Sequence, residues 1–171
     1  MTVNRTLDLL FPARESTVVF NPKHQEQIFY NQIRLKEYSI SLIGTGNTLP
    51  AKLNLKASEN IFNCNIAHGT TSPSFSIPIV LHNRQEQNGG EFTTFDFHYP
   101  YPFIVGQACT KRPDVATFIP GNIQFSLYDA NTNAKVTLFA NSSIVFELVG
   151  GKNEYITDQM NPKLNIPHSY H

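Results

Sequence analysis

The chain has 171 residues, and its 13 basic and 13 acidic side chains give a formal net charge of zero. Such a balance provides no general attraction to nucleic acid or to an anionic membrane surface, so we expect no nucleic-acid partner. Charged residues make up 15% of the chain and aromatic residues 12%. Because disordered chains are highly charged and poor in aromatic residues, this composition indicates one folded domain.

The first half of the chain shows apolar residues with a period of two, which is typical of β-strands. Residues 17–20 predict a first short strand. Ile33 and Leu35 then alternate with polar residues, and the phase slips by one position before Tyr38. A one-residue slip turns the following side chains to the other face, so we expect a bulge near Glu37. The alternation predicts further strands at residues 53–55, 62–66, 75–81 and 92–99.

The last third of the domain continues the same alternation in three segments, and Val115–Ile119 precedes them as a short strand. Polar and turn residues separate the three, so the pattern predicts three antiparallel strands joined by tight turns. Many short strands at this spacing predict an all-β, antiparallel sandwich or barrel over residues 15–150. The apolar residues of the three segments are Ile123, Phe125 and Leu127, then Val136 and Leu138, then Ile144, Phe146 and Leu148.

The two ends of the chain lack this periodicity, and we interpret residues 1–14 and 151–171 as extended N- and C-terminal arms. Such arms are either frayed ends or segments that order on a neighbouring subunit. In the second case Leu10 and Phe11 anchor the first arm, and Ile156 and Met160 anchor the second. The opening lacks the apolar core of a signal peptide, and no apolar run approaches the ~20 residues of a membrane span.

Few residues suggest chemistry, so we expect a protein that is not an enzyme and holds no cofactor or metal. No nucleophile motif is present, and the carboxylates are scattered. His82 and His98 could meet as a metal pair across a loop, but they lack a third ligand of defined spacing. Residues 129–133 resemble the opening of a calcium loop but lack the following Gly and the distal Glu, which leaves a hairpin turn as the simpler interpretation.

The aromatic stretch from Phe95 to Phe103 has three possible roles: a core strand, a subunit interface, or a platform on which bases or sugars stack. Pro100 and Pro102 lack backbone N–H groups and predict a loop at the end of a sheet. Aromatic side chains on a rigid loop suit an interface, so Tyr99, Tyr101 and Phe103 are interface candidates.

The segments 123–129, 135–138 and 143–148 together resemble the closing strands of small jelly-roll capsid proteins of icosahedral DNA viruses. The likeness is to vertex (penton) and minor capsid proteins of the double-jelly-roll lineage. It covers about 30 residues and rests on a pattern, not on an invariant motif. The resemblance implies a single jelly roll, because a double jelly roll needs about twice this chain length.

A capsid role implies a structural virion protein that acts by self-assembly, with a homo-pentamer as the favoured oligomer. Its other partners would be neighbouring capsid proteins and a spike protein or an internal membrane, and its location would be the virion. The alternative is a carbohydrate-binding or adhesive β-sandwich, in which exposed aromatic residues of segment 99–103 pack on sugar rings.

Overall fold

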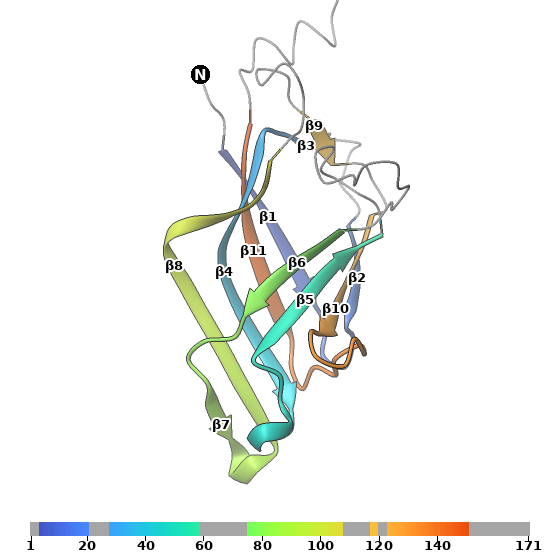
Figure 1. The fold of residues 1–171 in the computed structure, drawn as a ribbon, viewed down its shortest axis with the longest axis vertical. Coiled ribbons are helices and arrows are strands. Elements are labelled where there is room, and N and C mark those ends of the chain that lie inside the picture. The colour runs from blue at the N-terminus through green and yellow to red at the C-terminus, as the bar shows by residue number, and fades with distance from the viewer. Residues whose placement is uncertain (1–3, 21–27, 59–74, 108–116, 120–122, 151–171) are drawn as a thin grey trace, which may run out of the picture.

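The computed structural model describes residues 4–20, 28–58, 75–107, 117–119 and 123–150. These residues form a two-layer sandwich of antiparallel sheets, which confirms the all-β fold class (Figure 1). Sheet A has the order β1-β11-β4-β8-β7, and sheet B the order β2-β10-β5-β6. A separate pair, β3 (Ile28–Tyr30) and β9 (Thr117–Ile119), lies at one end. The strands of sheet A are β1 (Asn4–Phe11), β4 (Gln32–Ile43), β7 (Gln85–Gln87), β8 (Phe92–Gln107) and β11 (Ser142–Val149). Those of sheet B are β2 (Thr17–Phe20), β5 (Lys52–Ala57), β6 (Phe75–Val80) and β10 (Ile123–Asp129).

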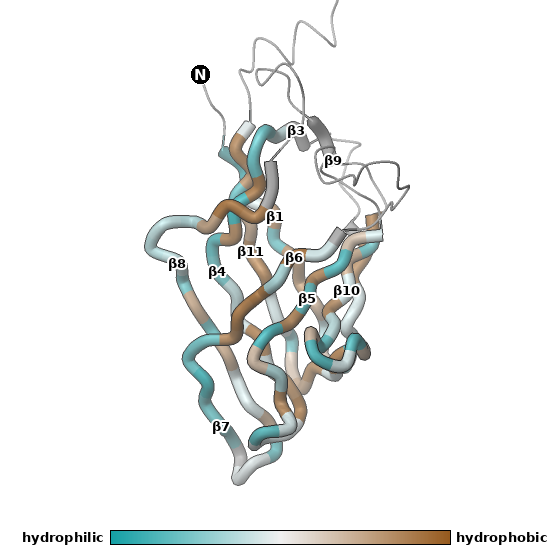
Figure 2. Tube along the Cα trace, in the orientation of Figure 1, coloured by the Kyte–Doolittle hydropathy of each residue, from teal (hydrophilic) through white to brown (hydrophobic). Residues whose placement is uncertain are grey.

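The core lies between the two sheets and is almost wholly apolar. Along β11, every second side chain is buried, and β5 shows the same alternation. Figure 2 shows the corresponding changes between hydrophobic and hydrophilic residues along the strands. Alternate side chains of a strand point to opposite faces, so each sheet contributes one apolar face to the interior. The largest fully buried side chains are Tyr30, Phe11, Phe125 and Phe146.

The phase slip near Glu37 is confirmed as an irregularity in strand pairing. The register of β4 against β11 shifts between Val145 and Phe146, opposite Glu37 and Leu35. The register of β4 against β8 shifts at the same two residues. Ile33 and Leu35 before the slip, and Tyr38 after it, are all buried. The extra residue therefore keeps the apolar side chains of both halves of β4 in the core.

The interpretation of residues 1–14 as an arm is wrong for residues 4–11. These residues form β1, which pairs with β11 through eight consecutive residue pairs. Leu7, Leu9 and Phe11 point into the core. The exposed Leu10 between the last two obscures this alternation in the sequence.

The prediction of three consecutive hairpin strands in the last third is also wrong. β10 lies in sheet B and β11 in sheet A, so the connection between them crosses from one layer to the other. Residues 135 and 138 make only isolated bridges, to Tyr128 and Leu42 respectively. Leu138 is nevertheless buried, so its apolar character reflects core packing at the end of the sandwich.

The structure adds one short strand, and two of the predicted segments lie outside the residues that it describes. The segment 85–87, which lies between the strands predicted at residues 75–81 and 92–99, forms the additional strand β7. The strand expected at residues 62–66 lies outside the described residues, as do the whole C-terminal arm, residues 151–171, and its anchors Ile156 and Met160.

Candidate interaction surface

The upper half of β8 carries the aromatic residues singled out above, and it leaves the regular ladder at the two prolines. His98 pairs with Glu37 and Phe103 with Leu35, so five steps along β8 oppose two steps along β4. Pro100 and Pro102 lie in this bulge, where a strand can accommodate residues without a backbone N–H. The segment is thus an irregular part of a strand and not the loop that the sequence predicts. Figure 1 shows β8 bending sharply in this upper half.

A row of ring contacts leads from the core to this bulge. The His82 ring lies 4.4 Å from that of Phe97, and Phe97 contacts Tyr99 edge-on at 4.6 Å. The Tyr99 ring in turn stacks against Phe103 at 6.4 Å. Burial raises the pKa of the Tyr99 phenol. The Tyr99 ring is therefore held in place by packing and supports the residues that follow it in the strand.

The residues beyond Tyr99 are open to solvent. Tyr101 is 88% exposed and Phe103 57% exposed, and Ile104 next to them is half exposed. Ile104 was not singled out in the sequence, although its position directly after Phe103 places an apolar residue on the other face of the strand. These three residues are exposed on both faces of the segment, and we refer to Tyr101, Phe103 and Ile104 together as the β8 apolar patch.

The two interface candidates near the N-terminus, Leu10 and Phe11, differ in their exposure to solvent. Leu10 is 62% exposed and points away from the core. Phe11 is fully buried between the sheets. Phe11 is therefore a core residue and the prediction that it anchors an arm on a neighbour is wrong, whereas Leu10 remains accessible to a partner.

A histidine–carboxylate contact and an Arg–Glu ion pair lie on the outer face of sheet A. His98 Nδ1 is 3.2 Å from a carboxylate oxygen of Glu37, its directly opposite residue on β4. Arg34 and Glu147 approach to 3.6 Å, again across neighbouring strands. Solvent screens such exposed pairs, which contribute at most about 1 kcal/mol each. They give this face a polar character beside the β8 apolar patch.

The metal-site alternatives find no support in the geometry. His82 packs on Phe97 while His98, the next residue along, pairs with Glu37, so the two histidines do not come together. Within the described ranges, no group of three or more His, Cys, Asp or Glu could hold a metal ion.

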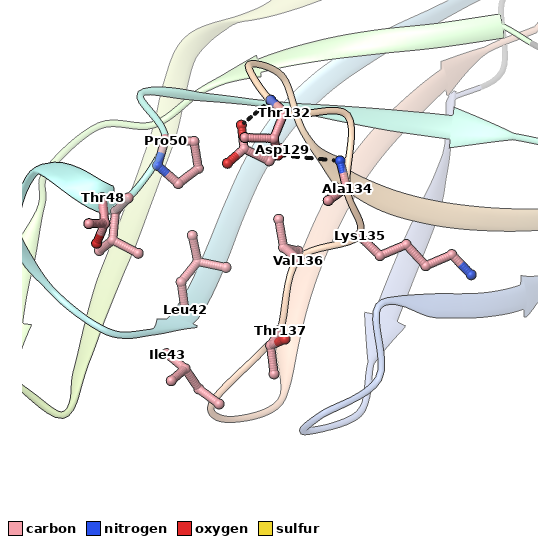
Figure 3. Close-up of a pocket in the computed structure, with 11 residues that line it drawn as sticks. Leu42, Ile43, Thr48, Pro50, Asp129, Thr132, Ala134, Lys135, Val136 and Thr137 are labelled. Atoms are coloured by element: carbon pink, nitrogen blue, oxygen red, sulfur yellow. Dashed lines mark hydrogen bonds between the residues drawn. The ribbon is translucent and has the colours of Figure 1, made fainter.

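A pocket of about 300 Å³ lies at the end of the sandwich, between the β4–β5 connection and the segment that follows β10 (Figure 3). Asp129 sits on its rim, and one carboxylate oxygen accepts backbone N–H bonds from Asn131 at 2.7 Å and Thr132 at 3.2 Å. These bonds form an Asx turn, so the carboxylate orders the turn that the calcium-like sequence pattern contains. Leu42, Pro50 and Val136 line the interior.

No known protein family and no curated protein matches this chain. One solved structure, titled "nora virus structure", aligns over 89% of this chain and 58% of that chain, at 14% identity and a TM-score of 0.14. This chain thus spans less than two thirds of the length of that one, and at such a score the alignment carries no argument about fold or function. Among the described residues, no helix is long and apolar enough to cross a membrane.

Proposed function

We propose that this protein is a structural virion protein, a single jelly roll that acts by self-assembly as a vertex or minor capsid subunit. The strand order of the two sheets is the observation that carries the proposal. Eight strands, taken in chain order without the short β3, β7 and β9, run 1-8-3-6 in sheet A and 2-7-4-5 in sheet B. This is the order in which two Greek keys fold into a jelly roll, the architecture of many viral capsid domains.

The interior supports a structural role over the other uses of the jelly roll. Larger β-barrels enclose ligand cavities, whereas here large apolar side chains occupy the space between the sheets. Phe11, Phe125 and Phe146 fill it from three different strands and are all almost fully buried. A sandwich filled in this way presents its contacts on strand edges, loops and outer faces, where a shell subunit meets its neighbours.

The β8 apolar patch and Leu10 are the proposed contact residues. Exposed aromatic residues that rest on a packed base lose little side-chain entropy on binding and make strong interface anchors. Phe103 stacks on the Tyr99 ring, and Tyr101 lies between these two residues in the bulge with most of its side chain exposed. In this proposal Ile156 and Met160 of the C-terminal arm add contacts to neighbouring capsid proteins, and a spike protein or an internal membrane is a further partner.

A pentamer is the proposed oligomer, with cyclic, heterologous contacts that close into a ring. The chain carries no net charge, so subunits approach one another without long-range repulsion. We propose no catalytic activity and no cofactor.

The experiment compares the native mass of the purified protein with that of two Tyr101 variants by light scattering. A ring has about five times the 19.3 kDa mass of one chain. Tyr101→Ala should shift the oligomer toward monomer. Tyr101→Phe, which keeps the aromatic side chain, should leave the oligomer intact. An oligomer that Tyr101→Ala leaves unchanged would remove the patch from the proposal, and a protein that is monomeric at every concentration would count against self-assembly.

A second candidate function is carbohydrate binding, which the high exposure of Tyr101 favours. Sugar rings stack on exposed aromatic faces, and Tyr101 offers one. Carbohydrate binding would replace assembly as the function if two results were obtained together. The protein would stay monomeric, and it would bind a glycan saturably, with this binding lost in the folded Tyr101→Ala variant.

A further inference from the structure

Sheet edges expose backbone N–H and C=O groups that can pair with another strand, and proteins normally block them. In sheet B, β2 has only four residues, and β6 carries Pro78 in its middle. On the β8 side of sheet A, β7 has three residues, and β8 beyond it contains the proline bulge. Among the described residues, three of the four edges of sheets A and B therefore carry a blocking feature.

The fourth edge, β1, carries none of these features. It has eight residues without proline, and its register against β11 is uninterrupted. In the described part of the chain, β11 is the only strand paired with β1. Thr6, Asp8 and Leu10 point outward and are exposed, while Leu7 and Leu9 are held in the core. The edge is thus long and regular, and its side chains fix its orientation.

We propose that β1 pairs with β1 of a second copy of this chain, antiparallel and across a two-fold axis, so that sheet A continues from one subunit into the next. The inference goes beyond the proposed ring, because a ring uses heterologous contacts and this contact is isologous. Together the two contacts place copies about two kinds of axis, as a closed shell requires.

The side chains of β1 select one register. Directly opposite residues in an antiparallel pair lie on the same face of the sheet. When the two strands are identical and related by a two-fold axis perpendicular to the sheet, one residue at the axis must therefore lie opposite its own copy. Only axes at Leu7 and at Asp8 allow seven residue pairs along the eight-residue strand. The axis at Asp8 places the two Asp8 carboxylates opposite each other, which destabilises the pair.

The axis at Leu7 avoids this repulsion and gives complementary neighbours. Thr6 of each copy then lies opposite Asp8 of the other, and the threonine hydroxyl can donate to the carboxylate. Asn4 lies opposite Leu10, where the exposed leucine side chain gains cover from the neighbouring strand. No residue pair in this register brings like charges together. A second copy therefore fits this edge without charge repulsion, and Thr6 and Asp8 provide polar contacts between the two strands.

Engineered disulfides test both the contact and its register. Cys64→Ala and Cys109→Ala first remove the native thiols, and Thr6→Cys with Asp8→Cys then places cysteines opposite each other in the Leu7 register. The matched control combines Thr6→Cys with Leu10→Cys, which are opposite each other only in the Asp8 register. All of these β1 positions are exposed, so both proteins should fold.

Oxidised glutathione serves as the oxidant and accepts the two electrons that each pair of thiols loses when it forms a disulfide. After this treatment, the Thr6/Asp8 variant should run on a non-reducing gel at twice the subunit mass. The Thr6/Leu10 control should run as a monomer. A monomer in both cases would overturn the inference. Cross-linking of the Thr6/Leu10 control would overturn the register, whether or not the Thr6/Asp8 variant also cross-links, because position 8 faces its own copy in the Asp8 register. A ring by light scattering without cross-linking would leave the proposed function standing, whereas cross-linked dimers without any ring would support this contact and count against the pentamer.

Discussion

Tyr38 provides the sharpest test of how the two sheets are held together. It belongs to β4 of sheet A, is buried, and its hydroxyl donates to the Val80 carbonyl at 2.8 Å at the end of β6 in sheet B. The same oxygen accepts the His82 backbone N–H at 2.7 Å. One phenol therefore satisfies two backbone groups of the opposite layer.

The substitution Tyr38→Phe removes this hydroxyl and leaves the ring packing intact. A backbone group that loses its partner costs about 1–3 kcal/mol when it is fully buried. The Val80 and His82 hydrogen bonds are part-buried and belong to one bridge, so we expect the free energy of unfolding to fall by about 2 kcal/mol near neutral pH. Urea unfolding followed by circular dichroism measures the change, because the chain has no tryptophan to report by fluorescence.

The difference between the two proteins should depend on pH. Burial, the largest cause, raises the pKa of Tyr38 from 10.0 to about 12 in the folded protein, and the His82 hydrogen bond opposes this in part. The unfolded chain then ionises first, so the stability that Tyr38 contributes is complete below pH 10 and is lost as the pH rises toward 12. The loss is about 1.4 kcal/mol at pH 11, which should close most of the gap between wild type and Tyr38→Phe.

Tyr101→Phe is the matched control, since it removes a hydroxyl from a tyrosine that is exposed. It should unfold like wild type at both pH values. A gap between wild type and Tyr38→Phe that is the same at pH 8 and pH 11 would refute the reasoning, because it would mean that the Tyr38 phenol ionises equally readily in the folded and unfolded chains.

Three further predictions concern single side chains, each measured by urea unfolding. Phe146→Ala should lower the free energy of unfolding by about 3–5 kcal/mol, because Phe146 is fully enclosed between the sheets; a loss below 1 kcal/mol would contradict its place in the core. Tyr101→Ala should change stability by less than about 0.5 kcal/mol, and a large loss would show that this side chain packs within the fold. Asp129→Ala should cost about 1 kcal/mol by removing the acceptor of the Asn131 and Thr132 N–H bonds, while Asp129→Asn, which keeps an oxygen there, should restore most of it; equal losses in both would argue against the Asx turn.

Period-two alternation predicted much of the sandwich because both sheets bury one face. The bulge near Glu37 was predictable for the same reason, since Ile33, Leu35 and Tyr38 must all reach the core. β1 was missed because the exposed Leu10 stands between the buried Leu9 and Phe11 and hides the alternation. Local pattern alone could not separate these residues, since pairing with β11, more than a hundred positions away, decides which of them is buried.

The assignment of strands to sheets was beyond the sequence pattern. Ile123–Asp129 and Ser142–Val149 alternate alike, yet they lie in different layers. The sequence of a single strand does not specify the strand with which it pairs, because many strands offer equivalent apolar faces. The candidate surface was predicted in part: the prolines indicated a departure from the sheet around Tyr101, but the exposure of Ile104 depends on how the bulge turns the strand.

The native mass of the purified protein, measured by light scattering over a range of concentration and salt, tests the central claim most directly. We expect a closed oligomer near five times the 19.3 kDa of one chain. A chain that remains at 19.3 kDa under every condition would contradict self-assembly as its mode of action and would turn attention to the glycan binding that Tyr101 could support.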